Sequence, residues 1–303
     1  MIASTDASAT PDIICIGETM ALVTPTDAPL AGAHQATISL AGAESNVAAG
    51  IAAAGRTVAW ASRLGDDPLG IRISTELARR GIQLWTETDD VAPTGVMFKD
   101  PGAEGSSVLY YRRASAASRM SPGFLAPERL AGARIVHTTG ITPALSPSTR
   151  AMVDQLFDDA RTAGARVSFD VNDRRALWSR QDAADTLARL ADAADITFVG
   201  RDEAERIWGT ATASEIRQFL PGCSLLVVKD GDVGATAFDG DAEPVFVPAP
   251  TVDVVEPVGA GDAFAAGFLA ATLEDRPMAE RLQAGHNAAA RVLRIAADMP
   301  PID

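Results

Sequence analysis

The hydrophobic pattern of the chain consists of short apolar runs separated by longer segments in which polar and apolar residues mix. The apolar runs are, in chain order, 12–17, 57–63, 81–86, 135–138, 166–170, 196–199 and 225–228. Continuous apolar runs of this length are typical of strands that are buried on both faces. The helices expected between the last four runs are 147–163, 182–191 and 202–208. This alternation predicts an α/β fold, a doubly wound and mainly parallel sheet covered by helices on both faces.

Three β-rich segments of the first half do not fit this alternation. Residues 94–99 and 107–113 are separated by Asp-Pro-Gly-Ala-Glu-Gly, a clear turn signal, and residues 35–40 alternate like an exposed strand. We therefore expect one domain over residues 12–303, with a small β-sheet lid formed by about 18–41 and 93–114.

Small residues open one expected helix near the N-terminus. The sequence Ala-Gly-Ala-Glu-Ser-Asn at 41–46 precedes a helical pattern over 47–54, which Gly55 ends. Small side chains here suit close packing of the helix, and they equally suit the close approach of a polyhydroxy ligand to the backbone. The sequence leaves both interpretations open.

A second glycine-rich turn lies late in the chain, at Gly259-Ala260-Gly261-Asp262. Residues 252–255 predict a short strand before this turn and residues 263–273 predict a helix after it. The free N–H groups at the start of a helix bind anions, so a phosphate would lie close to the carboxylate of Asp262. That carboxylate could then take a proton from a hydroxyl that attacks phosphorus. The alternative is a tight turn in which Asp262 only caps the helix.

The composition of the chain argues against several classes of binding partner. The net charge of −14 argues against nucleic acid and against anionic membranes, and an anionic substrate would need its own basic pocket. Two cysteines give neither a disulfide framework nor a zinc site. No apolar run reaches the length of a membrane span, and residues 1–11 lack the parts of a signal peptide. We expect a disordered tail over 1–11 and a cytoplasmic protein that binds small molecules.

Charged residues follow the predicted strands, and among them are arginines that suit an anionic substrate. Ligands of parallel sheets bind beyond the carboxyl ends of the strands, which is where Asp170 and Arg174 lie. Arg174 and Tyr110-x-Arg112 offer planar guanidinium groups that match a carboxylate. The alternative for Arg174 is a surface salt bridge with Asp170 or Asp173.

Together these motifs give the chain, from Asp12 to Asp298, a resemblance to the PfkB (ribokinase-like) family of carbohydrate kinases. The stretch from Gly42 to Asn46, followed by Gly55 and Gly65, resembles one family signature, and the turn at 259–262 resembles the other. Within the family the chain is most similar to 2-keto-3-deoxygluconate kinases. That similarity rests on 42–47, 110–112 with Ser115 and Ser118, 140–142, 169–174 and 177–179.

The resemblance implies ATP and Mg²⁺ as cofactors, phosphotransfer to the terminal hydroxyl of a sugar acid, and a homodimer formed through the lid. It implies that Asp262 is the catalytic base and that the amides of Gly259, Ala260 and Gly261 form an anion hole. The residues that it implies for the sugar acid are Gly42, Ala43, Asn46, Met97, Tyr110, Arg112, Arg174 and Asp298. Those that it implies for the nucleotide are Asn172, Lys229, Gly231, Gly234 and Asn287, with Glu203 orienting the metal through water.

The chain departs from the family pattern in four places. Glu256-Pro257 stands where Asp-Thr is common, Ala41 where a glycine is usual, Met97 where this subgroup often has tyrosine, and Gly200 where the metal motif has asparagine. A kinase of a neutral sugar such as ribose or fructose, and a non-catalytic sugar-binding protein on the same fold, are the alternatives. Asp262 argues against the second, because a binding protein needs no base there. A dehydrogenase is disfavoured because Gly17-Glu18-Thr19 does not supply the nucleotide-binding glycines.

Overall fold

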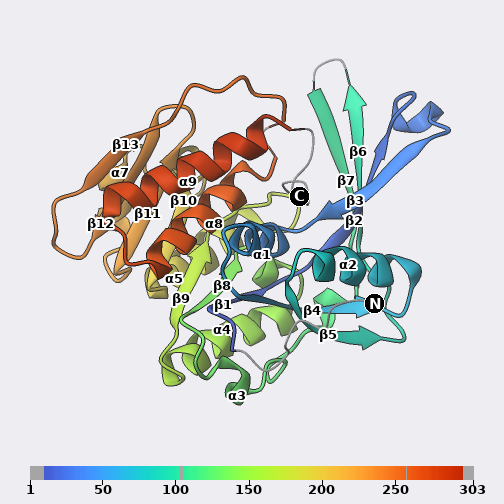
Figure 1. The fold of residues 1–303 in the computed structure, drawn as a ribbon, viewed down its shortest axis with the longest axis horizontal. Coiled ribbons are helices and arrows are strands. Elements are labelled where there is room, and N and C mark those ends of the chain that lie inside the picture. The colour runs from blue at the N-terminus through green and yellow to red at the C-terminus, as the bar shows by residue number, and fades with distance from the viewer. Residues whose placement is uncertain (1–9, 103–104, 257, 296–303) are drawn as a thin grey trace.

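A computed structural model of the chain describes residues 10–102, 105–256 and 258–295 (Figure 1). Within these residues a nine-stranded main sheet has the order β13-β12-β11-β10-β9-β8-β1-β4-β5. Its strands are β1 (Ile13–Ile16), β4 (Val58–Gly65), β5 (Gln83–Asp89), β8 (Ile135–Thr139), β9 (Arg166–Asp170), β10 (Ile196–Gly200), β11 (Leu225–Asp230), β12 (Gly234–Asp239) and β13 (Val245–Pro248). The strands from β11 to β5 pair in parallel, which confirms the predicted mainly parallel sheet.

The edge that carries β12 and β13 differs from the prediction. Both strands are antiparallel and were not predicted, and the strand expected over 252–255 is wrong. Residues 252–255 form a loop in which Val254 and Val255 are more than half exposed. The N–H of Val255 donates to the carbonyl of Leu293 instead of entering a sheet ladder. Apolar β-branched residues without a neighbouring strand do not make a strand.

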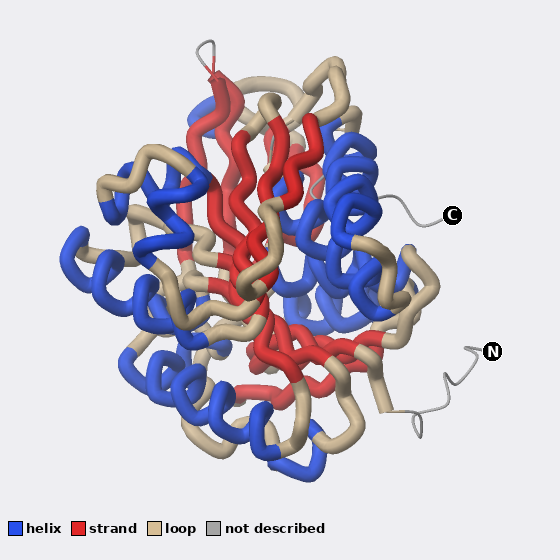
Figure 2. The backbone as a smooth tube through the Cα atoms, turned by 90° about the vertical axis from the view of Figure 1, so that its left-hand side faces the viewer, coloured by secondary structure: helices blue, strands red, loops and turns tan. Residues whose placement is uncertain are grey.

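Helices cover both faces of the main sheet (Figures 1 and 2). One face carries α1 (Ala43–Ala53), α2 (Pro68–Arg79), α8 (Ala260–Leu273) and α9 (Met278–Leu293). The other carries α3 (Pro127–Leu130), α4 (Pro147–Thr162), α5 (Arg180–Ala193), α6 (Arg201–Trp208) and α7 (Ala213–Phe219). Strand β1 is buried on both of its faces. Ile14 and Ile16 pack on the side covered by α3 to α7, whereas Ile13 and Cys15 pack on the side covered by α1, α2, α8 and α9. None of the helices in the described ranges is both long and apolar enough to span a membrane.

Helix α8 packs unusually closely on its neighbours. It is built mainly of alanine and glycine, and nearly all of its side chains are buried. A Cβ added to Gly50 of α1 would lie 2.5 Å from the Cβ of Ala266, and one added to Gly267 would lie 2.5 Å from the carbonyl oxygen of Ala284 on α9. The absence of these side chains lets α8 approach the neighbouring helices α1 and α9 closely.

Helices α1 and α8 both begin earlier than predicted. Gly42 caps α1, which starts at Ala43 rather than at residue 47, and Gly259 caps α8, which starts at Ala260 rather than at 263. Gly259 has a φ of 81°, a left-handed conformation that favours glycine. Asp262 therefore lies inside the first turn of α8, and the alternative in which it caps the helix is wrong.

A second, smaller sheet has the order β3-β2-β6-β7 and projects from the main body (Figure 1). Its strands are β2 (Met20–Pro25), β3 (Ala36–Ala41), β6 (Val96–Gly102) and β7 (Gly105–Tyr111), with β2 and β6 parallel and the other pairs antiparallel. Met20, Leu22, Ala41 and Met97 form a small apolar core on its inner face. Ile38, Leu109 and Tyr111 are exposed on its outer face.

Candidate active site

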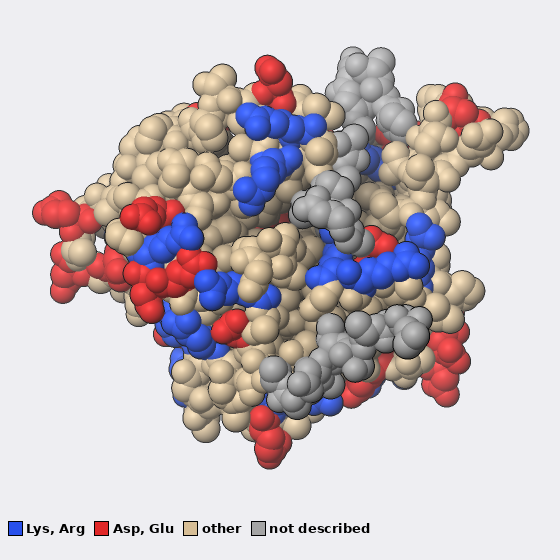
Figure 3. All heavy atoms as spheres, in the orientation of Figure 1, with Lys and Arg blue, Asp and Glu red and all other residues tan. Residues whose placement is uncertain are grey.

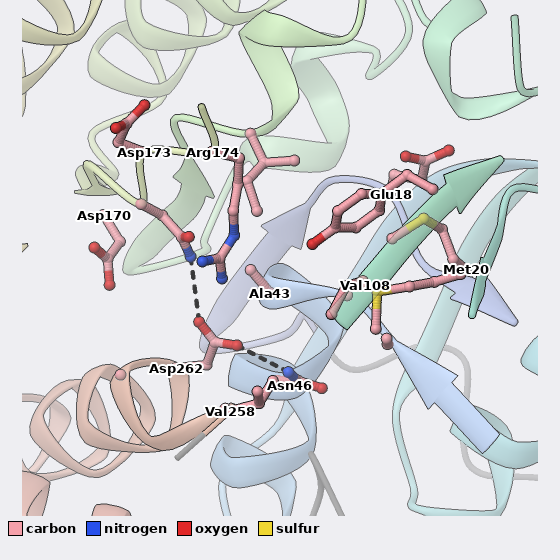
Figure 4. Close-up of a pocket in the computed structure, with 18 of the residues that line it drawn as sticks. Glu18, Met20, Ala43, Asn46, Val108, Asp170, Asp173, Arg174, Val258 and Asp262 are labelled. Carbon is pink, nitrogen blue, oxygen red and sulfur yellow. Dashed lines mark hydrogen bonds between the residues drawn. The ribbon is translucent and has the colours of Figure 1, made fainter. Parts of the chain in front are cut away.

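A cleft of about 490 Å³ lies between the carboxyl end of the main sheet and the inner face of the small sheet (Figure 4). One wall is the small sheet, with Met20, Met97 and Tyr110. The floor is the edge of the main sheet, where the loops after β9, β10 and β11 meet the start of α8. Figure 3 shows both acidic and basic side chains on one face of the molecule, so the charge of the cleft is assessed from its own lining residues.

Asp262 is held in place by two amide side chains that come from distant parts of the chain. Its side chain lies on the floor of the cleft, and the residue is only 7% exposed. The Nδ2 of Asn46 on α1 donates to its Oδ2 at 2.8 Å, and the Nδ2 of Asn172 donates to its Oδ1 at 3.4 Å (Figure 4). Asn172 has a φ of 38°, a conformation that asparagine tolerates better than most residues. Both contacts fix the carboxylate with its oxygens facing the cleft.

The surroundings of Asp262 raise its pKa to about 7. Burial is the largest cause, and the nearby carboxylate of Asp170 adds to it. The hydrogen bond from Asn46 and the positive charges of Arg174 and Lys229 act in the opposite direction. A carboxylate whose pKa lies near neutrality is suited to accept a proton in a reaction at that pH.

The start of α8 offers backbone amides to the same space. Gly259 and Gly261 line the cleft, and the first N–H groups of a helix have no acceptor within the helix. The Nζ of Lys229 lies 3.5 Å from where a Cβ on Gly261 would be. A helix N-terminus beside an ammonium group forms a site for an anion such as a phosphate.

Lys229 is surrounded by carboxylates at the end of β11. Its Nζ donates to Oδ2 of Asp170 at 2.7 Å. Burial alone would lower the pKa of Lys229, but the negative charges of Asp170 and Glu203 outweigh it, and the pKa is raised. The ammonium group therefore stays charged beside the helix start.

Glu203 uses its carboxylate to organise the backbone around it. It accepts the N–H of Gly200 at 3.2 Å and also the N–H of Asp173. Burial, and then the charge of Asp170, raise the pKa of Glu203. Its oxygens line the floor of the cleft while they fix the loops after β9 and β10.

Arg112, which directly follows β7 of the small sheet, is neutralised inside the protein. Its guanidinium forms a buried ion pair with Glu18, with Nε donating to Oε2 at 2.6 Å, and Ser115 donates to the same carboxylate. The guanidinium carbon of Arg112 lies 5.8 Å from the centre of the Tyr110 ring. Arg112 lines the cleft, but Glu18 already satisfies its charge.

Arg174 lies on the opposite side of the cleft without a direct ion pair. It follows β9, is exposed, and points towards Asp262, whose pKa its positive charge lowers (Figure 4). Over the described ranges it forms no ion pair, and the two neighbouring aspartates have other partners, Asp170 with Lys229 and Asp173 with Arg206. The alternative of a salt bridge to either aspartate is therefore wrong.

Most of the predicted site residues meet in this one cleft. Those that line it are Gly42, Ala43, Asn46, Met97, Tyr110, Arg112, Asn172, Arg174, Glu203, Lys229, Gly259, Gly261 and Asp262. Those that lie outside its lining are Ala260, Gly231, Gly234 and Asn287. Gly231 lies in the β11–β12 turn and Asn287 is exposed on α9, where its Oδ1 accepts from Gln283. Asp298 lies outside the described residues.

Sequence reasoning missed five charged residues of the cleft: Glu18, Lys99, Asp173, Asp202 and Arg206. Glu18 directly follows the first apolar run, and Asp202 precedes Glu203 by one residue, so their positions at strand ends were available as a signal. Lys99 lies two residues after Met97 on β6 and hence on the same face of the strand. Arg206 has no such local signal.

The chain was compared with families and with individual proteins. A model of the pfkB family carbohydrate kinases matches residues 10–299. The 2-dehydro-3-deoxygluconokinase of Bacillus subtilis (strain 168) is 35% identical, over 95% of this chain and 91% of that protein. The 2-dehydro-3-deoxygalactonokinase of Haloferax volcanii is 33% identical, over 93% and 90%. Fructokinase-1 of Oryza sativa subsp. japonica is 30% identical, over 87% and 83%.

Solved structures give the same picture of the fold. The crystal structure of a PfkB protein from Polaromonas sp. JS666 superposes with a TM-score of 0.86 at 36% identity, and covers 94% of this chain and 96% of its own.

Proposed function

The chain belongs to the pfkB family of carbohydrate kinases, and on this premise we propose that it transfers a phosphoryl group from ATP to the terminal hydroxyl of 2-keto-3-deoxygluconate, giving the 6-phosphate. The observation that carries the substrate class is Arg174, a cation without an ion-pair partner among the described residues, which faces the cleft in a chain of net charge −14. The carboxylate of a sugar acid is the natural partner for that charge.

In this proposal the two ends of the sugar acid meet different parts of the cleft. Arg174 and Tyr110 hold the carboxylate end, while Gly42, Ala43 and Asn46 let the hydroxyl chain approach the start of α1. Arg112 acts mainly by supporting Tyr110, because its guanidinium is already paired with Glu18. The far hydroxyl is then delivered to Asp262.

Asp262 takes the proton of this hydroxyl as its oxygen attacks the terminal phosphorus of ATP. The amides at the start of α8 and the ammonium group of Lys229 stabilise the negative charge that spreads over the transferred phosphoryl oxygens. Asn46 and Asn172 keep the base oriented throughout.

The carboxylates near Lys229 fit a magnesium ion held mostly by other ligands. Across the described ranges no group of three or more metal-binding side chains occurs, and Mg²⁺ in kinases takes phosphate oxygens and water as most of its ligands. Glu203 would act through water, since its oxygens accept two backbone amides, and Asp202 lies beside it. When bound, the ion would neutralise charge on the phosphates of ATP. The nucleoside would extend beyond the cleft along Gly231, Gly234 and Asn287.

The substrate proposal is tested by comparing 2-keto-3-deoxygluconate, 2-keto-3-deoxygalactonate, fructose and ribose with ATP and Mg²⁺, in the wild type and in Arg174→Ala. A charge-assisted hydrogen bond contributes about 1.5–3 kcal/mol, so Arg174→Ala should lower kcat/KM for the acids by roughly 10–100-fold. Activity on a neutral sugar should change little, because no carboxylate contact is lost. The matched control is Arg175→Ala, since Arg175 is also exposed but does not line the cleft.

A kinase of a neutral sugar is the second candidate, favoured by the similarity to a fructokinase and by the apolar Met97 in the cleft wall. It is the correct assignment if fructose or ribose is the best substrate of the wild type, or if Arg174→Ala affects acids and neutral sugars equally.

We also propose that the small sheet acts as a lid and that its outer face binds a second copy of this chain. Ile38, Leu109 and Tyr111 are 40%, 43% and 67% exposed there, which is a costly apolar surface unless it is covered. Pairing would also protect the edge strands β3 and β7. Light scattering that gives a monomer at micromolar concentration would reject the dimer. A cytoplasmic location agrees with a need for ATP and with two buried free thiols, Cys15 and Cys223.

A further inference from the structure

A second ion pair links the small sheet to the loop that leads into α8. Lys99 on β6 pairs with Glu256, and each side chain is only 16% exposed. The two residues are 157 positions apart in the chain. Lys99 shares the inner face of the small sheet with Met97 and lines the cleft. The pair thus joins the wall of the cleft to the backbone just before Gly259.

Glu256 also organises the loop on its own side of the pair. Its Oε1 accepts the N–H of Val258 at 3.2 Å, and the N–H of Val255 donates to the carbonyl of Leu293 on α9 at 2.8 Å. Val258 is followed directly by Gly259, the left-handed residue that starts α8. One carboxylate therefore contacts both the small sheet and the residue that precedes the helix start.

We infer that Glu256 is a positioning residue for phosphoryl transfer, and that with Lys99 it aligns the amides of residues 259–261 when the small sheet lies over the cleft. The inference rests on the proposed function in one respect, the use of these amides to bind the transferred phosphoryl group. Donors that stabilise a transition state must be placed to within a fraction of an ångström, so a loop held at only one end would be a poor site.

This role differs from that of the other ion pair in the cleft. Arg112 and Glu18 are both nearly fully buried and hold the base of the small sheet together. Lys99 and Glu256 connect two parts of the molecule that must come together around a substrate. A contact of this kind affects the rate more than the stability of the fold.

The test is a double-mutant cycle on kcat with Lys99→Met, Glu256→Gln, both together, and the charge exchange Lys99→Glu with Glu256→Lys. Each single neutral variant should lower kcat by about tenfold, the cost expected when a transition-state donor is misaligned, while the KM for the sugar changes by less than about threefold. The double variant should lose little more than the worse single variant, because both break the same contact. Lys99→Arg should retain most of kcat, because it keeps the cation and the carboxylate that accepts the N–H of Val258. The charge exchange should remain slow, because Glu256→Lys removes that acceptor.

The matched control is the charge exchange Arg56→Glu with Glu274→Arg, an ion pair between the loop after α1 and the end of α8 that does not line the cleft. It should leave kcat unchanged. Thermal unfolding of each variant identifies those that are simply unfolded, and Glu256→Gln keeps the size of the side chain so that one variant remains folded.

Three results would overturn the inference. Additive losses in the cycle would show that the two side chains act separately. A KM increase in Lys99→Met that is restricted to sugar acids would mean that Lys99 binds the carboxylate itself. A loss of melting temperature without a loss of kcat would make the pair structural only. All rates are measured on the fastest sugar of the panel, so a neutral sugar as best substrate rejects the substrate proposal and leaves this test intact.

Discussion

The two sides of the cleft handle their charges in opposite ways. At the base of the small sheet Arg112 and Glu18 neutralise each other in a buried pair, and Lys99 on its inner face is paired with Glu256, beside an apolar core. On the floor, Asp170, Glu203 and Asp262 share one nearby ammonium group, that of Lys229. Arg174 faces the same space without an ion pair among the described residues.

This contrast separates the surface that shapes the cleft from the surface that performs chemistry. A neutralised pair adds rigidity to a wall but has no charge to offer a ligand. Burial and the charge of Asp170 raise the pKa values of Glu203 and Asp262, and the value of about 7 for Asp262 suits proton exchange near neutral pH. In the proposed mechanism the proton and the phosphoryl group are transferred at the floor, and the wall determines which substrate fits above it.

Asp262→Asn tests the floor with the largest expected effect. The substitution keeps the shape of the side chain and removes the base, so kcat should fall by roughly 10²–10⁴-fold while sugar affinity changes little. Turnover on the best substrate and sugar binding by calorimetry are the two measurements. Near-normal turnover of this variant would show that Asp262 is not the base. The floor would then not differ from the wall in the way described.

Arg112→Met and Glu18→Gln test the wall. Arg112→Met leaves the buried charge of Glu18 unpaired, and Glu18→Gln leaves that of Arg112 unpaired. The free energy of unfolding should therefore fall by about 3–5 kcal/mol in each variant. The control is Glu87→Gln, because Glu87 is an exposed carboxylate whose ion pair with Arg63 contributes only about 0–1 kcal/mol. Urea unfolding measures all three. If Arg112→Met instead leaves stability unchanged and weakens sugar acids selectively, the wall binds the substrate charge and the contrast is wrong.

The pH dependence sharpens the comparison further, with a smaller effect. The pKa of Asp262 is about 7, so kcat/KM should fall by about tenfold per pH unit below that value as the base becomes protonated. Asp170→Asn removes a neighbouring negative charge, so the pKa of Asp262 and the acid limb of the profile should move to lower pH. A limb that does not move would show that burial alone sets this pKa.

The same pKa makes a prediction about stability whose sign is fixed. Asp262 has a higher pKa in the folded protein than the ordinary value of 3.8, so the fold favours its protonated form. Its contribution to stability is complete below about pH 3.8 and is lost as the pH rises through about 7. In Asp262→Asn the free energy of unfolding should lose this part of its pH dependence, as measured by urea unfolding from pH 5 to 8.

The local sequence pattern was enough to predict the buried parallel strands and the glycine-rich turn. Strand β9 lies at the predicted residues 166–170, because a continuous apolar run between helices has one stable place in such a fold. Asp262 was identified from the glycine turn beside it. Residues 252–255 have the same β-branched composition as a strand but meet no partner strand, and only the folded chain reveals that.

Contacts between distant residues were beyond the reach of the sequence. Arg112 looks like a ligand for a carboxylate until Glu18, 94 positions earlier, is seen to provide one. Lys99 and Glu256 have no local signal of their pairing. Gly231, Gly234 and Asn287 were assigned by resemblance to the family rather than from the residues themselves, and none of them lines the cleft.

The close packing of α8 makes some positions of the protein much less tolerant of substitution than others. A methyl group added at Gly50 or Gly267 meets the next helix, and no rotation of a side chain relieves that clash, although neither glycine lines the cleft. Met97 and Tyr110 project into the cleft from the four-stranded small sheet, where a change of side chain needs only local adjustment. Substitutions can therefore reshape the wall of the cleft more easily than the packing that places the start of α8.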